Sequence, residues 1–267
     1  IKRTSNQIPF HNKIFDVVQF DDNQLTPIKD ATPVTIMEEV TNPDYFTDLS
    51  MISRSQELSI IDVTRIKIIA QTLAHIHSEN QPAHYYLRYL RDWFGNGILD
   101  LTNTIHTLFN EDEIIKLNYK FIEWEHQLSK KKNRCKKIHG EFFPGTITFS
   151  SENKLKTFDM RRIGAGEPAD DVGSIIFNYM YQSIIDHNTI ITCFVESINI
   201  FLHEYLLRSK DYELKKFLQV FIAYRCLICI HPDLVPIPLS KKERLKKMIF
   251  PLLNQKEFDL SQIAKIY

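Results

Sequence analysis

The sequence predicts an α+β fold, in which a large, mainly helical body follows a smaller N-terminal part that contains strands. Three observations support this prediction. Apolar residues recur at helical spacing over most of the chain after about residue 55. Residues 145–160 instead alternate apolar and polar positions around the polar turn SSENK, which is typical of a β-hairpin. The run VTIMEEV (34–40) opens with β-branched residues and precedes the turn signal TNPD, which indicates another strand.

Each later block supports the helical body in turn. The spacing of Ile66, Ile69, Leu73 and Ile76 predicts a helix that ends near residue 77. Helical patterns also cover residues 84–94 and 100–131, and the Gly95–Gly97 pair between them predicts a tight turn or an inter-helix loop. The last two blocks are expected to be long apolar helices over 174–231 and an amphipathic helix, LSKKERLKKMIFPLLN, over 239–254.

Composition and charge narrow the class of protein. The 267 residues are 43% hydrophobic and 25% charged, which is typical of a globular chain with one large domain or two unequal lobes. The formal net charge of +0 gives no electrostatic basis for nucleic-acid binding. No apolar run approaches the length of about 18 residues that a membrane span needs, and no signal peptide opens the chain. Cys226 and Cys229 form a CxxC within an apolar run, which favours buried thiols and a reducing, cytoplasmic location.

The basic run KKKNRCKK (130–137) interrupts this ordinary composition. We expect a solvated loop between helices, because runs of like charge usually face water. The alternative is a landing site for a phosphate group or an acidic substrate.

Glycine and carboxylate residues gather around the predicted hairpin. The chain has 7 glycines, none of them before Gly95, and five lie between Gly140 and Gly173. His139, Gly140 and Glu141 precede the first strand, and Asp159 ends the second. Because the two flanks of a hairpin lie close together, we expect Glu141 and Asp159 to face a common cleft. Such carboxylates can act as a general base and a Mg²⁺ ligand, whereas the alternative is that they cap backbone amides.

The segment HGEFFPGTITFSSENKLKTFDMRRIGAGEPADDVGSI (139–175) resembles a phosphotransferase family that includes aminoglycoside phosphotransferases and choline-type kinases, relatives of protein kinases. Weaker resemblances place a helix end at LAHIH (73–77), the hinge strand at TIMEEV (35–40) and the αC helix at NQIPFHNKI (6–14). The resemblance implies a protein-kinase-like fold. Residues 1–40 would form a truncated N-lobe and hinge, and residues 41–267 a helical C-lobe with a catalytic-loop hairpin at 139–160.

The resemblance also implies a role for individual residues. Glu141 falls on the catalytic Asp that deprotonates an acceptor hydroxyl, Asp159 on the Asp that binds metal, and Thr146 on the Asn that helps to hold a second metal. The implied cofactors are ATP, or another nucleoside triphosphate, and Mg²⁺. The resemblance also implies that Lys2 binds the phosphates and that Glu39 lies in the hinge, which holds adenine through its backbone. Asp171 falls on a residue that braces the catalytic loop, a position that N-capping alone would also explain. Asp170 is expected to face solvent.

Two kinds of function follow from this resemblance. An enzyme would transfer the γ-phosphate of ATP to a hydroxyl of a small molecule or peptide, with Trp93 and Phe94 as stacking surfaces in the acceptor pocket. The alternative is a catalytically impaired, pseudokinase-like binding protein or a subunit of a modifying complex. Three departures favour it: Thr146 lacks the carbonyl of Asn, Gln7 replaces the αC Glu, and no glycine-rich loop precedes residue 95. A third interpretation is an unrelated helical scaffold with an incidental hairpin.

Overall fold

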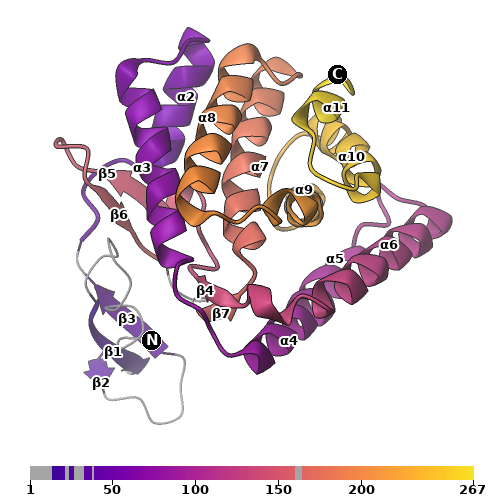
Figure 1. Ribbon diagram of the computed structural model, residues 1–267, viewed down its shortest axis with the longest axis horizontal. Coiled ribbons are helices and arrows are strands. Elements are labelled where there is room, and N and C mark those ends of the chain that lie inside the picture. Colours follow the sequence, from indigo (N-terminus) through magenta and orange to yellow (C-terminus); the bar gives the residue numbers. More distant parts are fainter. Residues whose placement is uncertain (1–13, 22–23, 27–32, 38, 160–163) are drawn as a thin grey trace.

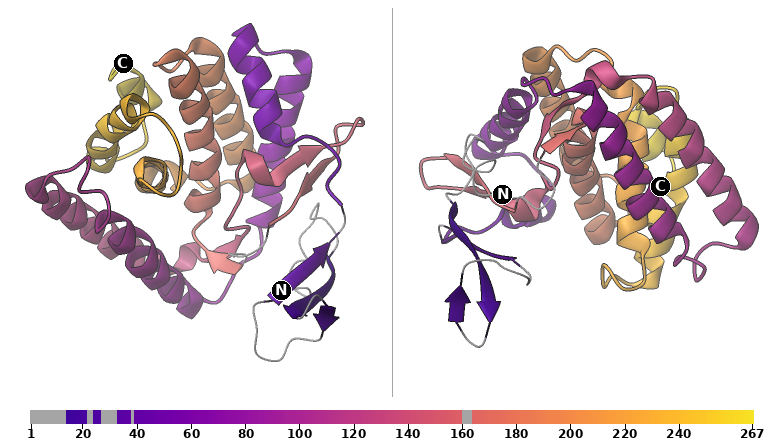
Figure 2. Two further views of the ribbon diagram at one scale, coloured as in Figure 1. Left: turned by 180° about the vertical axis from the view of Figure 1, so that it is seen from behind. Right: turned by 90° about the horizontal axis from the view of Figure 1, so that it is seen from below.

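The computed structural model describes residues 14–21, 24–26, 33–37, 39–159 and 164–267. Its N-terminal part is an antiparallel sheet in the order β2-β1-β3, built from β1 (Ile14–Asp21), β2 (Gln24–Thr26) and β3 (Pro33–Met37). The strand predicted from VTIMEEV is therefore confirmed as β3. Of the proposed αC segment (6–14), residues 6–13 lie outside the described residues, and Ile14 begins β1. In Figures 1 and 2 this sheet lies beside the hairpin at one side of the helical body.

The helical body begins at α2 (Tyr45–Ser55) and α3 (Ile60–Ile76), and α3 starts at a capping box between Ser59 and Asp62. The other helices are α4 (Ala83–Asp92), α5 (Asp100–Thr102), α6 (Glu111–Ser129), α7 (Pro168–His187), α8 (Thr192–Ser209), α9 (Leu218–Ile230), α10 (Leu239–Asn254) and α11 (Leu260–Ala264). Short 3₁₀ turns are η2 (Lys132–Arg134), η3 (Pro144–Thr146) and η4 (Leu214–Lys216). The helix predicted over 239–254 is confirmed with the same bounds.

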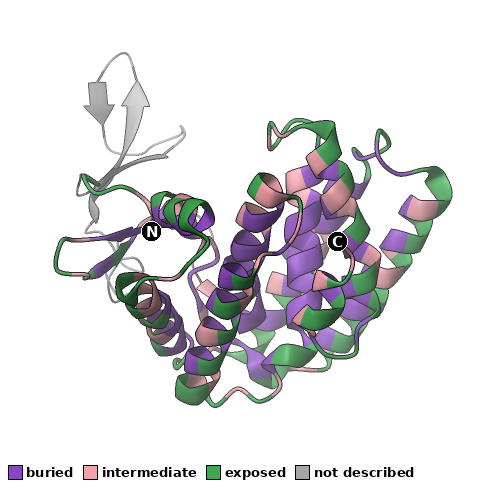
Figure 3. Ribbon diagram, turned by 90° about the horizontal axis from the view of Figure 1, so that it is seen from above, coloured by how far each residue is buried: buried purple, intermediate pink, exposed green. Residues whose placement is uncertain are grey.

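The core of this body surrounds α7. Helix α7 packs against α9, α8 and α2, while α3 packs on α8 and α10 on α9. Figure 3 shows that buried positions gather on the helix faces that meet inside the body, while exposed positions line the outer faces. Cys226 is fully buried within this core, Cys229 is half-buried, and both thiols are free, as the apolar run around the CxxC predicts.

Two short strand pairs carry the segment between α6 and α7. The predicted hairpin is confirmed as β5 (Ile147–Phe149) paired with β6 (Leu155–Thr157), with Thr148 opposite Lys156. The sequence gives little sign of the second pair, β4 (Lys136–Ile138) with β7 (Gly164–Gly166). A β-bridge from Asp44 to Thr148 ties the start of α2 to the hairpin.

The region around Gly95 and Gly97 differs from the prediction. Residues Trp93–Leu99 continue α4 as one stretch of π-helix, η1, which leads directly into α5, so no turn or loop separates them. Gly97 leaves room for Tyr224, whose hydroxyl would lie only 3.0 Å from a Cβ at this position. Trp93 is 1% exposed and packs against Phe121, Phe221 and Tyr224, so its ring belongs mainly to the core, and the residue also lines the cavity described below.

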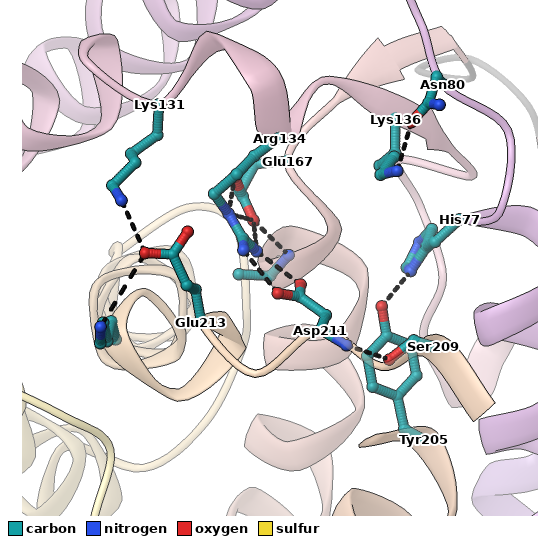
Figure 4. A network of polar contacts seen from close by, with 12 residues as sticks. His77, Asn80, Lys131, Arg134, Lys136, Glu167, Tyr205, Ser209, Asp211 and Glu213 are labelled. Atoms are coloured by element: carbon teal, nitrogen blue, oxygen red, sulfur yellow. Dashed lines mark hydrogen bonds and ion pairs between the residues drawn. The ribbon is translucent and has the colours of Figure 1, made fainter. Parts of the chain in front are cut away.

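The basic run 130–137 is only partly the solvated loop that its charge suggests. It forms η2 and β4, and it buries both Arg134 and Cys135. Arg134 bridges two carboxylates: its Nη2 donates to Glu167 at 2.6 Å, and its Nη1 donates to Asp211 at 2.6 Å (Figure 4). The hydroxyl of Tyr86 also donates to Glu167, at 2.6 Å.

The charge of Arg134 depends on these partners. Burial opposes the charged form of the guanidinium, but the neighbouring carboxylates of Glu167 and Asp211 outweigh burial and raise the pKa of Arg134 above its usual value. Glu167 itself is fully buried, and Arg134 is its cation partner. The side chain of Arg134 therefore holds the segment before β4 to the start of α7, through Glu167, and to the segment that follows α8, through Asp211.

We therefore expect Arg134→Leu to destabilise the fold strongly, because it leaves Glu167 buried without its cation. The free energy of unfolding, measured by urea denaturation, is expected to fall by about 3–5 kcal/mol. The control is Arg88→Leu, which removes an arginine whose side chain is 72% exposed and is expected to cost less than about 1 kcal/mol. Equal, small losses in both variants would contradict the structural role of Arg134.

Candidate functional site

The loop that follows β4 is held by one carboxylate of α7. Asp171 is fully buried, and its two oxygens accept hydrogen bonds from the backbone N–H groups of His139, at 2.7 Å, and Gly140, at 2.8 Å. Gly140 has a φ of 81°, a left-handed conformation in which glycine carries no steric penalty. Glu141 comes next in the chain, so Asp171 fixes the backbone directly before the predicted catalytic residue. Asp171 therefore acts as a brace of this loop and does not simply cap its own helix.

Asp171 is in turn held from two helices. His77 at the end of α3 lies 3.1 Å from Asp171 through its Nε2 and 2.8 Å from the hydroxyl of Tyr205 on α8 through its Nδ1. Because an ionised carboxylate only accepts hydrogen bonds, Nε2 of His77 is the donor to Asp171, while Nδ1 is hydrogen-bonded to the hydroxyl of Tyr205. His77 was the last residue of the LAHIH motif, but the sequence did not indicate which residue it would bind.

The electrostatics of Asp171 follow from these contacts. Burial alone would raise the pKa of its carboxyl group. The hydrogen bond and charge of His77, with the nearby ring of His139 and the backbone N–H of His139, outweigh burial, and the pKa is lowered below its usual 3.8. The brace is thus a charged carboxylate inside the protein.

Asp170 corrects a prediction. We expected it to face solvent, but it is fully buried beside Asp171. Its Oδ1 accepts a hydrogen bond from Nη2 of Arg225 on α9 at 2.6 Å, and its Oδ2 accepts one from the hydroxyl of Tyr89 on α4 at 3.0 Å. The sequence offered no signal for this pairing, because Arg225 lies 55 residues away in an apolar helix.

Thr146 connects the loop to the hairpin. Its hydroxyl is buried and lies 2.8 Å from the carbonyl oxygen of Glu141, and its own carbonyl accepts a hydrogen bond from the N–H of Phe158 at 3.1 Å. The hydroxyl also lies within hydrogen-bond distance of the backbone of Phe143. The hydrogen bonds of Thr146 therefore close the loop. They also bring the main chain of Glu141 near Phe158, the residue that precedes Asp159.

The predicted catalytic and metal residues stand at this junction. Glu141 and Asp159 are both partly exposed, in contrast to the buried residues that support them. Asp159 has a φ of 64°, which is uncommon for a residue with a side chain and is found in turns and at functional sites. Glu39, the predicted hinge residue, is exposed directly after β3, whereas Lys2 and Gln7 lie outside the described residues.

This arrangement suits a metal only when a ligand supplies further donors. Among the residues that the structure describes, no group of three or more His, Cys, Asp or Glu side chains gathers around one point. Mg²⁺ commonly takes one or two carboxylates from a protein and the rest of its oxygens from phosphates and water. A site built from Asp159 with few protein ligands fits that chemistry, and the oxygen donors of Asp and Glu suit a hard cation.

A cavity of about 910 Å³ opens beside this loop. It extends from Gly140 and the β4–β7 pair to α4 and η1, and Tyr85, Tyr89, Arg88 and Lys137 contribute to its wall. Gly140 is the residue that precedes Glu141, so the cavity reaches the predicted catalytic loop. Its volume suits a small organic molecule.

No protein-family model matches this sequence, and no curated protein sequence matches it. Several solved structures, however, match this chain in fold. A glucosamine kinase superimposes with a TM-score of 0.62 at 12% identity, over 94% of this chain and 67% of the other. A Plasmodium vivax ethanolamine kinase gives 0.59 at 12% identity, over 94% and 69%.

An amicoumacin kinase in complex with AMP-PNP, Ca²⁺ and Ami gives a TM-score of 0.60 at 12% identity, over 98% of this chain and 78% of the other. The structural neighbours are thus small-molecule kinases. They confirm the α+β, protein-kinase-like fold with a helical C-lobe, and they exclude the unrelated helical scaffold.

The lowered pKa of Asp171 predicts how the brace responds to acid. Because the folded state binds this proton less readily than the unfolded chain, the stabilisation is present above pH 3.8 and is lost as the pH falls below it. Asp171→Asn is expected to lower the free energy of unfolding at pH 7 by about 1–3 kcal/mol. The difference between the two proteins should shrink by up to about 1.4 kcal/mol per pH unit below that value.

Urea denaturation between pH 3 and pH 7 measures this difference directly. Glu257→Gln, at an exposed position between α10 and α11 that does not touch the loop, serves as a control for the loss of one carboxylate elsewhere. A constant difference between Asp171→Asn and the wild-type protein over the whole range would contradict a charged, buried brace.

Proposed function

We propose that this protein is an ATP-dependent phosphotransferase that acts on a hydroxyl group of a small molecule. The observation that carries the proposal is the braced loop: Asp171 fixes the backbone before Glu141, and Thr146 ties that residue to the strand end that presents Asp159. The likeness of the fold to small-molecule kinases supports it. Phosphoryl transfer asks a protein mainly for positioning and electrostatic stabilisation, which a rigid loop of this kind provides.

Each residue then has one role. Glu141 accepts the proton of the acceptor hydroxyl while the acceptor oxygen forms its bond to the γ-phosphorus, and ADP leaves with the oxygen that bridged the β- and γ-phosphates. Asp159 would hold Mg²⁺, which supplies charge neutralisation to the phosphates when it is bound. Thr146 was predicted as a second metal ligand, but we now assign its hydroxyl to holding the loop. Lys2 remains the candidate for binding phosphate and the backbone at Glu39 the candidate for holding adenine.

The cavity beside Gly140 is the proposed acceptor site. It adjoins the loop that carries Glu141, and its size fits a small molecule rather than a folded protein. No described helix is long and apolar enough to span a membrane. The predicted cytoplasmic location stays a proposal, and so does the division at residue 40.

The alternative is a catalytically impaired relative that binds a ligand or a protein partner. One observation favours it: the hydroxyl of Thr146 is buried and engaged with the backbone of Glu141 and Phe143, so it does not replace the amide that the second metal would need. The Gln at position 7 points in the same direction.

Asp159→Asn is expected to lower Mg²⁺-dependent ATP turnover by about 10²–10³-fold or more, because it removes the charge that would hold the metal. Asn tolerates the left-handed backbone that Asp159 adopts, so the fold should be kept, as circular dichroism would verify. Glu152→Gln, at an exposed position of the turn between β5 and β6, is the matched control and should leave turnover unchanged. Unchanged turnover in Asp159→Asn would remove this residue from the metal role.

Nucleotide binding separates the enzyme from the impaired relative. If the enzyme proposal is correct, ATP with Mg²⁺ should raise the melting temperature, since a ligand at 100 times its Kd adds about 2.7 kcal/mol of stability. The shift should become smaller in Asp159→Asn. Absence of any shift at millimolar ATP would favour the non-catalytic alternative.

A further inference from the structure

A second cavity, of about 490 Å³, lies on the other side of the residues that hold Asp171. It is enclosed by the end of α3, by η2 and β4, and by the end of α8 with the segment that follows it. The side chains of Lys136, Arg208 and Lys210 contribute positive charge to its wall, and Asn133, Ser78 and Ser209 contribute neutral polar groups. Figure 4 shows Lys136, His77, Tyr205 and Ser209 around this region.

Each acidic residue of the wall is paired with a cation, although Arg134 also pairs with the buried Glu167. Asp211 accepts two hydrogen bonds from Arg134, at 2.6 and 2.7 Å, and Glu213 forms an ion pair with Lys131 at 2.6 Å. Both carboxylates therefore direct their charge to cations of the protein and not into the cavity. The Nε and Nη2 groups of Arg134 donate to Glu167, so most of the donors of this guanidinium are already engaged.

Two lysines in this wall form no ion pair with a carboxylate of the described residues. Lys136 donates to the neutral side-chain oxygen of Asn80, which leaves its charge uncompensated and further N–H groups available. Lys210 follows the last turn of α8 and makes no side-chain hydrogen bond or ion pair with any residue that the structure describes. Two lysines with hydroxyl and amide groups between them form a wall that suits an anion.

The cavity also touches the support of the catalytic loop. Its wall includes His77 and Tyr205, whose side chains are hydrogen-bonded to each other at 2.8 Å. His77 in turn holds Asp171, which accepts the N–H groups of His139 and Gly140. A ligand that orders the cavity wall would thus restrict the residues that fix the loop.

We propose that this cavity is a binding site for a phosphate or phosphomonoester group, held by Lys136 and Lys210, and that its occupancy steadies the catalytic loop through Tyr205, His77 and Asp171. The wall of this cavity shares no residue with the wall of the proposed acceptor site, and its existence does not depend on catalysis. It gives the basic run 130–137 a function through Lys136, while Arg134 of the same run serves the fold.

The first experiment measures binding of inorganic phosphate by isothermal titration calorimetry at constant ionic strength. We expect the double variant Lys136→Gln/Lys210→Gln to bind phosphate roughly tenfold more weakly than the wild-type protein, because each lost contact is an exposed ion pair. The matched control is Lys132→Gln, an exposed lysine of η2 outside the cavity wall, which should bind like the wild-type protein. Equal phosphate binding in all three proteins, or no binding to any, would overturn the proposal.

The second experiment tests the link to the loop by hydrogen exchange. The amides of His139 and Gly140 donate to Asp171, so their exchange reports on the brace without any assay of activity. Phosphate should slow exchange in peptides that span these amides. Tyr205→Phe removes the hydroxyl that contacts His77 and should abolish this slowing while phosphate still binds. Slowing that persists in Tyr205→Phe, or that is absent from the wild-type protein, would contradict the coupling.

Discussion

The structure depends on the burial of three carboxylates at the start of α7. Glu167, Asp170 and Asp171 are each fully buried, and the N-terminal end of a helix favours negative charge there. Favourable position is not enough for buried charge, so each carboxylate also has its own cationic or imidazole partner. These partners are Arg134 before β4, Arg225 on α9 and His77 at the end of α3. These partners come from elements that are distant in the sequence, and each ion pair holds its own element at the start of α7.

The candidate site is a consequence of this arrangement. Because Asp171 uses both of its oxygens on consecutive backbone N–H groups, it holds the backbone directly before Glu141. Gly140 accepts the left-handed backbone that this conformation requires, and Thr146 closes the far end of the loop. The groups proposed for chemistry are partly exposed, while the groups that position them are buried. This division suits a site that must present side chains without reorganising, which is the main demand of phosphoryl transfer.

Much of the fold could be predicted because its signals are local. The periodicity around Ile66 and the run at 239–254 gave helices, and alternation gave the β5–β6 hairpin. Interactions between distant residues could not be predicted in this way. Asp170 and Arg134 looked like solvated charges because their partners lie 55 and 33 residues away. Gly95 and Gly97 looked like a turn because a π-helix packed against Tyr224 has no distinct sequence pattern. The β4–β7 pair escaped notice because no turn joins its strands: the β5–β6 hairpin lies between them in the sequence.

The free-energy cost of burying these carboxylates indicates what the ion pairs do for the fold. Replacing a buried ion pair by apolar side chains of similar volume is often neutral or stabilising, so three such pairs are weak contributors to stability for their own sake. What apolar packing does not provide is direction: only a carboxylate can accept from two adjacent N–H groups while an imidazole orients it. At Asp171 the pairing determines a backbone conformation, and at Glu167 it determines where the segment before β4 runs. Each polar group that is buried to fix the loop needs a hydrogen-bond partner of its own. Asp171 is therefore bonded to His77, and His77 to Tyr205, and both of these residues line the wall of the second cavity.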